Sequence, residues 1–288
     1  MATYELETEH RKDCFLAFLK PRLGAAALAS AGGGRARLMV FVHGGNGHFI
    51  QTWTNSNTKA YWPKLVRDDT VNFGSMDVAM FDYFSPILTE APGMEATANM
   101  LRELLTEQKS ADYDDIVFVP HSLGGVVTRQ LLVDLEKDKD PLLGKTRLVA
   151  SMTCAYGGSA VAKLLCTLGS QNGHFKDSKP GSSYLIKLNA QWEALRQTLN
   201  PHKRHRPFVW SVRGESDRYI TRENAELGSD VVSAHGTNPE LLFPKRLRQA
   251  RPESKRILGH SDIVKPDNSD HAVHRALRVA FRLAVSDG

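Results

Sequence analysis

The chain has 288 residues, of which 41% are hydrophobic and 24% charged, with a formal net charge of +5. This is an ordinary globular composition, and a chain of this length can bury a large core without metal or disulfide support. No apolar run approaches the roughly 18 residues of a membrane-spanning helix, which excludes that class. The three cysteines are too few for a disulfide framework, so we expect a reducing compartment and a cytoplasmic protein, with secretion less favoured.

The N-terminal residues 1–36 are expected to form an extension and linker that packs on or near the main domain. Gly24–Gly34 is rich in alanine and glycine, which favours a flexible linker. The weak apolar run Leu23–Ala31 begins too late, and follows too many acidic residues, for a secretory signal.

From Arg37 onward, short apolar runs alternate with longer helical patterns. The predicted strands are residues 38–42, 78–83, 116–119, 147–152 and 208–212, and the predicted helices lie near 95–109, 124–135, 183–199 and 271–284. Nearly continuous apolar strands that alternate with helices indicate an α/β fold, with a mostly parallel central sheet covered by helices on both faces. We expect one domain over residues 37–288, with a small cap-like insertion at about 156–182 and a basic insertion at about 227–256.

The net positive charge is concentrated in one segment of the second insertion. Between Pro244 and Arg256, six basic residues stand against Glu253 alone. A solvated loop or helix face is the favoured interpretation, and contact with an anionic substrate or a membrane surface is the alternative. No RNA or DNA motif accompanies these residues, so a nucleic-acid partner is not expected.

The strand at 116–119 is followed by Pro120-His121-Ser122-Leu123-Gly124-Gly125 and then by a helix. A serine on a tight strand-to-helix turn is a nucleophile elbow, in which the turn exposes the hydroxyl at a helix N-terminus. Gly124 supplies the small residue that the turn needs, while Pro120 stands where a glycine is usual. We therefore predict Ser122 as a nucleophile; the alternative is a serine that only caps the helix.

The first predicted strand ends in a glycine-rich turn, His43-Gly44-Gly45-Asn46-Gly47. Such a turn lets a backbone N–H face the reaction site, as the oxyanion of acyl transfer requires. We predict the N–H groups of Gly45 and Leu123 as the oxyanion hole; a plain loop is the alternative. The segment matches no dinucleotide or nucleotide phosphate motif, and no cofactor is expected.

The carboxylate that orients the base is expected after a later strand. The strand at 208–212 is followed by a turn with two acids, Glu215 and Asp217. We favour Asp217, because a shorter side chain at the fourth position of this turn is usual in folds with a nucleophile elbow.

The base is expected to be a histidine beyond that acid, since the chain order in such folds is serine, acid, histidine. We favour His260, which lies in a loop just before the last helix. His235, His271 and His274 are the alternatives. The last two have helical spacing, but no third ligand accompanies them, so we predict no metal site.

Three further residues are candidates for the substrate pocket. His43 and His121 flank the site, and either hold loops in place or line the pocket. Trp53 belongs to an aromatic segment that forms either a pocket wall or part of the core.

Together these blocks resemble the α/β-hydrolase superfamily, and within it the lipase-like serine esterases related to the GPI-inositol deacylases. The residues that carry the resemblance are Phe41-Val42-His43-Gly44, Trp53, Trp62-Pro63, His121-Ser122-Leu123-Gly124-Gly125, Gly158-Ser159, Gly214 with Asp217, and His260-Ser261 with Ile263-Val264-Lys265-Pro266. The resemblance implies a metal-independent hydrolase of esters or thioesters with a Ser-His-Asp triad.

The leading hypothesis from the sequence is a carboxylesterase or lipase that acts on a small-molecule or lipid-like ester. A phospholipase or acyl-protein thioesterase is the first alternative. The second is a non-catalytic α/β-hydrolase binding module, which the complete serine, acid and histidine order disfavours. The oligomeric state is left open.

Overall fold

A central sheet organises the chain in the computed structural model, which describes residues 6–10, 14–30, 35–86, 90–159, 162, 172–198, 207–213, 217, 219–221, 223–224, 227, 231–234 and 259–285. Within these ranges, eight strands pair in the order β1-β2-β4-β3-β5-β6-β7-β8. They are β1 (Leu6–His10), β2 (Cys14–Leu19), β3 (Arg37–Val42), β4 (Asp77–Tyr83), β5 (Asp115–Pro120), β6 (Thr146–Met152), β7 (Phe208–Arg213) and β8 (Val231–Ala234).

The six strands from β3 onward are parallel to one another, whereas β2 pairs antiparallel with both β1 and β4. This confirms the expected mostly parallel sheet. The apolar runs explain it, because every residue of β5 is buried and β3, β4 and β6 are buried along nearly their whole length. Strands of this kind need cover on both faces.

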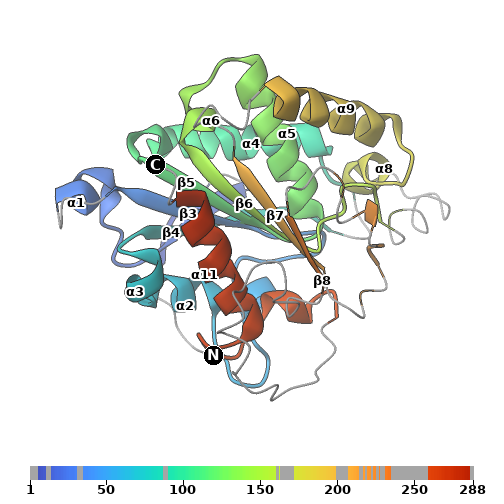
Figure 1. The fold of residues 1–288 in the computed structure, drawn as a ribbon. Coiled ribbons are helices and arrows are strands. Elements are labelled where there is room, and N and C mark those ends of the chain that lie inside the picture. The colour runs from blue at the N-terminus through green and yellow to red at the C-terminus, as the bar shows by residue number, and fades with distance from the viewer. Residues whose placement is uncertain are drawn as a thin grey trace.

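Helices supply that cover on both sides of the sheet (Figure 1). One core contains the apolar faces of α4 (Met94–Glu107), α5 (Leu123–Lys137) and α9 (Ser183–Thr198). The other contains those of α2 (Trp62–Asp68), α3 (Thr70–Phe73) and α11 (Ala272–Val285). The remaining described helices are α1 (Gly24–Ser30), α6 (Pro141–Lys145), α8 (Gly173–Asp177) and the short 3₁₀ helices η1 (Gln51–Trp53), η2 (Ser110–Asp112) and η4 (Asp262–Val264).

The N-terminal residues differ from the sequence expectation. Strands β1 and β2 belong to the central sheet, where β2 pairs with β4. Residues 24–30, which we expected to be part of a flexible linker, form helix α1. The carboxylate of Asp77 accepts the backbone N–H groups of Leu23 (2.8 Å) and Gly24 (2.7 Å), so a distant strand supplies the N-terminal cap that the local sequence lacks.

The two predicted insertions are described in part. Within 156–182, Tyr156 and Ala162 are buried and α8 forms a short helix, while residues 160–161 and 163–171 lie outside the described residues. In the basic insertion, β8 adds an unpredicted parallel strand beside β7. The basic cluster between Pro244 and Arg256 lies outside the described residues.

The carboxyl ends of the parallel strands meet at one edge of the sheet, which is where open α/β sheets place their sites.

Across the described part of the chain, no helix is both long enough and apolar enough to cross a bilayer.

Candidate active site

Ser122 occupies the sharp turn between β5 and α5. Its backbone φ is +53° and its ψ is −121°, a conformation that costs energy for a residue with a side chain. A side chain on Gly124 would clash with the carbonyl oxygens of Val42 and His43, and one on Gly125 would clash with Cys154. The glycines therefore let α5 begin close against β3 and β6, and the turn sets Ser122 at the helix N-terminus.

Pro120, which stands where a glycine is usual, fits as the last residue of β5. Proline lacks an N–H, so the sheet loses one hydrogen-bond donor at this position. The hydrogen bonds to the neighbouring strands resume at once, because His121 N–H donates to Val42 O (2.9 Å) and Ser122 N–H donates to Met152 O (3.1 Å). The departure from glycine leaves the elbow intact.

The imidazole of His260 joins Ser122 to Asp217. His260 Nε2 lies 3.0 Å from Ser122 Oγ, and His260 Nδ1 lies 2.7 Å from Asp217 Oδ2. A carboxylate only accepts hydrogen bonds, so Nδ1 carries the proton and Nε2 accepts the Ser122 hydroxyl. The structure thus brings together three side chains that are up to 138 positions apart in the sequence.

The carboxylate of Asp217 is buried and accepts several hydrogen bonds. Oδ1 accepts the backbone N–H groups of Tyr219 (2.8 Å) and Ile220 (3.0 Å), and Oδ2 accepts the hydroxyl of Thr153 as well as His260. Burial alone would raise the pKa of Asp217, but the hydrogen bonds and charge of His260, with the Thr153 hydroxyl, lower this pKa to about 2. Asp217 is therefore ionised at any pH near neutrality.

Two neighbours hold the His260 ring in place. The ring of His121 lies 4.9 Å away, and His121 Nε2 lies 3.0 Å from the backbone oxygen of His260. Burial, together with the nearby His260, lowers the pKa of His121 to about 3, so this histidine is neutral and donates from Nε2. On another side, Tyr219 meets the His260 ring edge-on at 5.3 Å.

The glycine-rich loop after β3 lies directly against the elbow. A Cβ atom built on Gly44 would stand 2.7 Å from Ser122 Cβ, and one on Gly45 would stand 3.1 Å from Leu123 Cδ1. Among the described residues, neither the Gly45 N–H nor the Leu123 N–H has an acceptor. Leu123 is the first residue of α5, so its N–H has no partner within the helix. Within the described part of the chain, these two backbone donors near Ser122 are thus free.

Two of the pocket candidates are core residues instead. Trp53 is fully buried and packs edge-on against Phe41 (5.0 Å) and against His121 (6.2 Å). His43 is also fully buried beneath the glycine-rich loop. Neither forms part of an open pocket wall, because the aromatic residues after β3 turn inward onto the sheet. The competing residues Glu215 and His235 lie outside the described residues.

The other reactive side chains are engaged elsewhere. His274 is fully buried on α11, where Nδ1 accepts Trp62 Nε1–H (3.2 Å) and Nε2 lies 3.1 Å from Asp69. Burial raises the pKa of the Cys154 thiol to about 12, which leaves it protonated and unreactive. In the parts of the chain that the structure describes, no three side chains are arranged to hold a metal ion.

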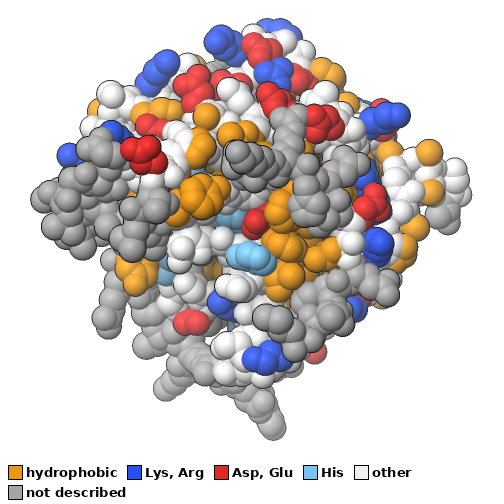
Figure 2. Space-filling view, turned by 180° about the vertical axis from the view of Figure 1, so that it is seen from behind, with side chains coloured by type: hydrophobic (Ala, Val, Ile, Leu, Met, Phe, Trp, Pro, Cys, Tyr) orange, Lys and Arg blue, Asp and Glu red, His pale blue; other side chains and the backbone are white. Residues whose placement is uncertain are grey.

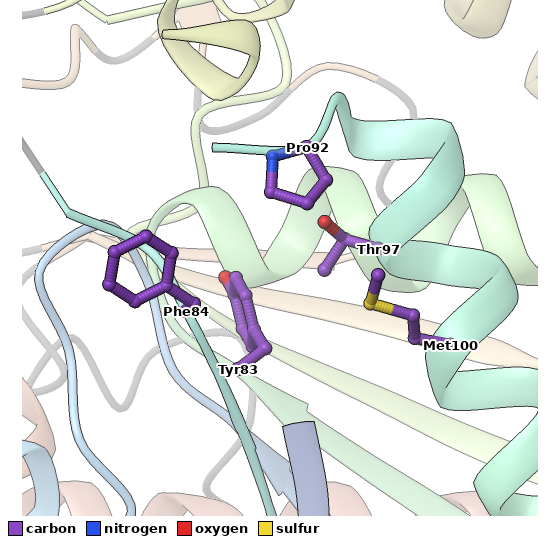
Figure 3. Close-up of a pocket in the computed structure, with 5 residues that line it drawn as sticks. All are labelled: Tyr83, Phe84, Pro92, Thr97 and Met100. Atoms are coloured by element: carbon purple, nitrogen blue, oxygen red, sulfur yellow. The ribbon is translucent and has the colours of Figure 1, made fainter. Parts of the chain in front are cut away.

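A small pocket of about 190 Å³ opens between the end of β4 and α4 (Figure 3). Its lining consists of Tyr83, Phe84, Pro92, Thr97 and Met100. The space-filling view in Figure 2 shows hydrophobic side chains gathered beside histidines near the centre of the face that Figure 1 hides. Sequence reasoning did not single out the pocket residues, since they come from a strand end and a helix with no motif.

No known family model matches the chain, and no curated protein matches it by sequence. Solved structures do share its fold. The mature lipase BlEst2 of Bacillus licheniformis is 16% identical, with 83% of this chain and 91% of that chain covered and a TM-score of 0.50. Est1E of Butyrivibrio proteoclasticus is 11% identical, with 98% of each chain covered and a TM-score of 0.50. Phospholipase PlaB of Legionella pneumophila is 17% identical, with 62% of this chain covered and a TM-score of 0.47; this chain spans 38% of its length.

The strand order, the elbow after β5 and the likeness to BlEst2 and Est1E define an α/β-hydrolase fold. This confirms the fold that the sequence motifs indicated. The narrower resemblance to the GPI-inositol deacylases stays a prediction.

Proposed function

We propose that the chain is a serine hydrolase that cleaves carboxylic esters through an acyl-serine intermediate. The observation that carries the proposal is the continuous chain of hydrogen bonds from Ser122 through His260 to Asp217, at 3.0 and 2.7 Å. A nucleophile, a base and an orienting carboxylate in this arrangement are what acyl transfer by a serine requires. The two free N–H groups of Gly45 and Leu123 support the same reaction.

In the proposed mechanism, His260 Nε2 takes the proton from Ser122 as the hydroxyl oxygen attacks the ester carbonyl. The tetrahedral intermediate places its negative oxygen at the Gly45 and Leu123 N–H groups, near the positive end of the α5 dipole. His260 then returns the proton to the leaving alcohol. Water attacks the acyl-serine by the same route and releases the acid.

Asp217 has two tasks in this mechanism. Its carboxylate fixes the Nδ1–H tautomer of His260, which keeps Nε2 free to act as the base, and its charge stabilises the imidazolium that forms during the attack. The low pKa of Asp217 supports this role, because the carboxylate stays ionised throughout the cycle.

The proposed substrate is a small or lipid-like ester. BlEst2, which shares the fold, is described as a lipase. Phospholipid and acyl-thioester substrates undergo the same attack at a carbonyl carbon. Rates on p-nitrophenyl esters, phospholipids and acyl-thioesters therefore separate the leading proposal from the phospholipase and thioesterase alternatives.

Labelling with a fluorophosphonate probe tests the proposal. The wild-type chain is expected to react at Ser122, and Ser122→Ala is expected to remove both the label and ester hydrolysis. His260→Ala should reduce kcat by up to about a million-fold, as in comparable triads. The matched control is Ser30→Ala, which removes an exposed serine on α1 and should label normally. A wild-type chain that takes no label would contradict the proposal.

A further inference from the structure

The backbone oxygen of Gly44 accepts three hydrogen bonds. Gly47 N–H donates at 3.0 Å, the Nδ1 atom of His43 lies at 2.8 Å, and Ser85 Oγ donates at 3.2 Å. Ser85 is also joined to the loop through its own carbonyl, which accepts the N–H of Asn46 at 2.6 Å. A carbonyl with this many donors cannot turn without the loss of several hydrogen bonds.

This carbonyl belongs to the same peptide group as the Gly45 N–H. A peptide group is planar and trans, so its C=O and N–H bonds point in opposite directions. The donors that hold Gly44 O therefore also set the direction of the Gly45 N–H. A Cβ atom on Gly44 would stand 3.2 Å from Leu123 N, so the Gly44–Gly45 peptide group lies beside the Leu123 N–H, the other predicted oxyanion donor.

Contacts to both nitrogens and one face hold the ring of His43. It is fully buried, and its ring stacks on Tyr83 at 4.4 Å with an interplanar angle of 2°. Because Gly44 O can only accept, His43 Nδ1 carries a proton. Nε2 accepts the backbone N–H of Tyr83 at 3.3 Å, with Asp82 Oδ1 3.2 Å away, so the end of β4 holds the opposite edge of the ring.

We propose that Ser85 and His43 are positioning residues, which hold the Gly44 carbonyl so that the Gly45 N–H faces the oxyanion formed when Ser122 attacks. The inference rests on the proposed ester hydrolysis and extends it to two residues that do not touch the reacting atoms. Glycine makes this loop flexible in itself, since it loses the most conformational freedom on ordering. The hydrogen bonds to Gly44 O supply the rigidity that an oxyanion hole needs.

Substitution of Ser85 tests the proposal with little disturbance of the fold. Ser85→Ala is expected to lower kcat for p-nitrophenyl butyrate about tenfold and to leave KM within about twofold, because the Gly45 N–H acts mainly on the transition state. Ser85→Thr keeps the hydroxyl and should recover most of the loss. The matched control is Thr146→Val at the opposite end of the sheet, which also removes a buried hydroxyl bonded to a backbone carbonyl, that of Leu142.

A thionoester provides a readout that a purely structural role would not change. Sulfur accepts hydrogen bonds weakly, so a well-aimed N–H favours the ester over its thionoester. Ser85→Ala should reduce the ratio of ester to thionoester kcat/KM about tenfold, whereas Thr146→Val should leave that ratio as in the wild type. His43→Asn, whose amide can still donate, should reduce the ratio less than His43→Leu.

The outcomes separate this inference from the proposed function. A wild-type chain that takes no fluorophosphonate label would overturn the proposed function and this inference with it. A labelled and active wild type, together with a Ser85→Ala variant whose kcat and ester to thionoester ratio match those of Thr146→Val, would overturn this inference alone.

Discussion

At the scale of single residues, Thr153 links the ends of β6 and β7 and contacts Asp217, the candidate acid. It follows β6, is fully buried and has a φ of +46°, which is unfavourable for a β-branched residue. Its N–H donates to Val212 O at 2.6 Å, and its hydroxyl donates to Asp217 Oδ2. The strained backbone is compensated by hydrogen bonds that connect the end of β6 to β7 and to the turn that follows it.

Thr153→Val is expected to lower kcat about tenfold and to leave KM nearly unchanged. Valine keeps the shape and the backbone strain of threonine, but it leaves Asp217 Oδ2 with one donor fewer, so the carboxylate holds His260 less firmly. Steady-state kinetics on p-nitrophenyl butyrate measure the effect. Thr153→Ser is the control, since it retains the hydroxyl. Equal kcat values for Thr153→Val and the wild type would show that the hydroxyl has no part in holding the acid.

The sequence alone predicted the three side chains that the fold joins by hydrogen bonds, but not their supporting partners. Ser122, Asp217 and His260 could be found because each follows a recognisable pattern in a set chain order. Thr153 and Ser85 carry no such signal: Thr153 and Asp217 are 64 positions apart, and only the packed fold brings them together. For Trp53 the sequence left a pocket wall and the core open, because an aromatic residue after a strand fits both, and the structure places it in the core.

At the scale of elements, helix α1 depends on a cap from the sheet. The carboxylate of Asp77, at the start of β4, is buried and accepts the N–H groups of Leu23 and Gly24 and the hydroxyl of Tyr113 (2.6 Å). Three donors thus converge on one side chain. The helix therefore begins where the sheet supplies an acceptor.

Asp77→Ala is expected to lower the free energy of unfolding by about 2–3 kcal/mol, because buried donors lose their acceptor. Urea unfolding, followed by circular dichroism, measures this change. The matched control is Asp112→Ala, which removes an exposed carboxylate on η2 and should cost little. If the two variants unfold at the same urea concentration, Asp77 does not hold α1 on the sheet.

The strands from β3 to β7 were predictable because each is a nearly continuous apolar run, which has few alternatives to a buried parallel strand. The N-terminal pair was missed for different reasons. Strand β1 is short and rich in polar residues, as a strand paired on only one side can be. Residues 24–30 include four alanines, the best helix former, but the flanking glycines suggested a linker. The deciding interaction, the cap from Asp77, comes from 53 positions away.

At the scale of the whole molecule, several histidines are kept neutral inside the fold. Burial lowers the pKa of His121 to about 3 and that of His174 to about 4, and it also lowers the pKa values of His271 and His274. In the unfolded chain these side chains bind protons near pH 6.5. The unfolded state therefore binds more protons than the folded state once the pH falls below that value.

This difference predicts that the folded state loses stability as the pH falls from about 6.5 toward 4, by up to about 1.4 kcal/mol per pH unit for each buried histidine. Asp217 affects stability only at lower pH. The stability that its ionised carboxylate contributes is present above the unfolded pKa of 3.8 and is lost as the pH falls from there toward 2. Urea unfolding at pH 7.5, 6 and 5 measures the slope. His174→Gln removes one of these histidines, so its stability should fall less steeply between pH 6 and 5 than that of the wild type. Above pH 7, histidine protonation should add no pH dependence to the free energy of unfolding of either protein. Equal slopes of that free energy at acidic pH would mean that His174 takes up protons as readily inside the fold as in the unfolded chain.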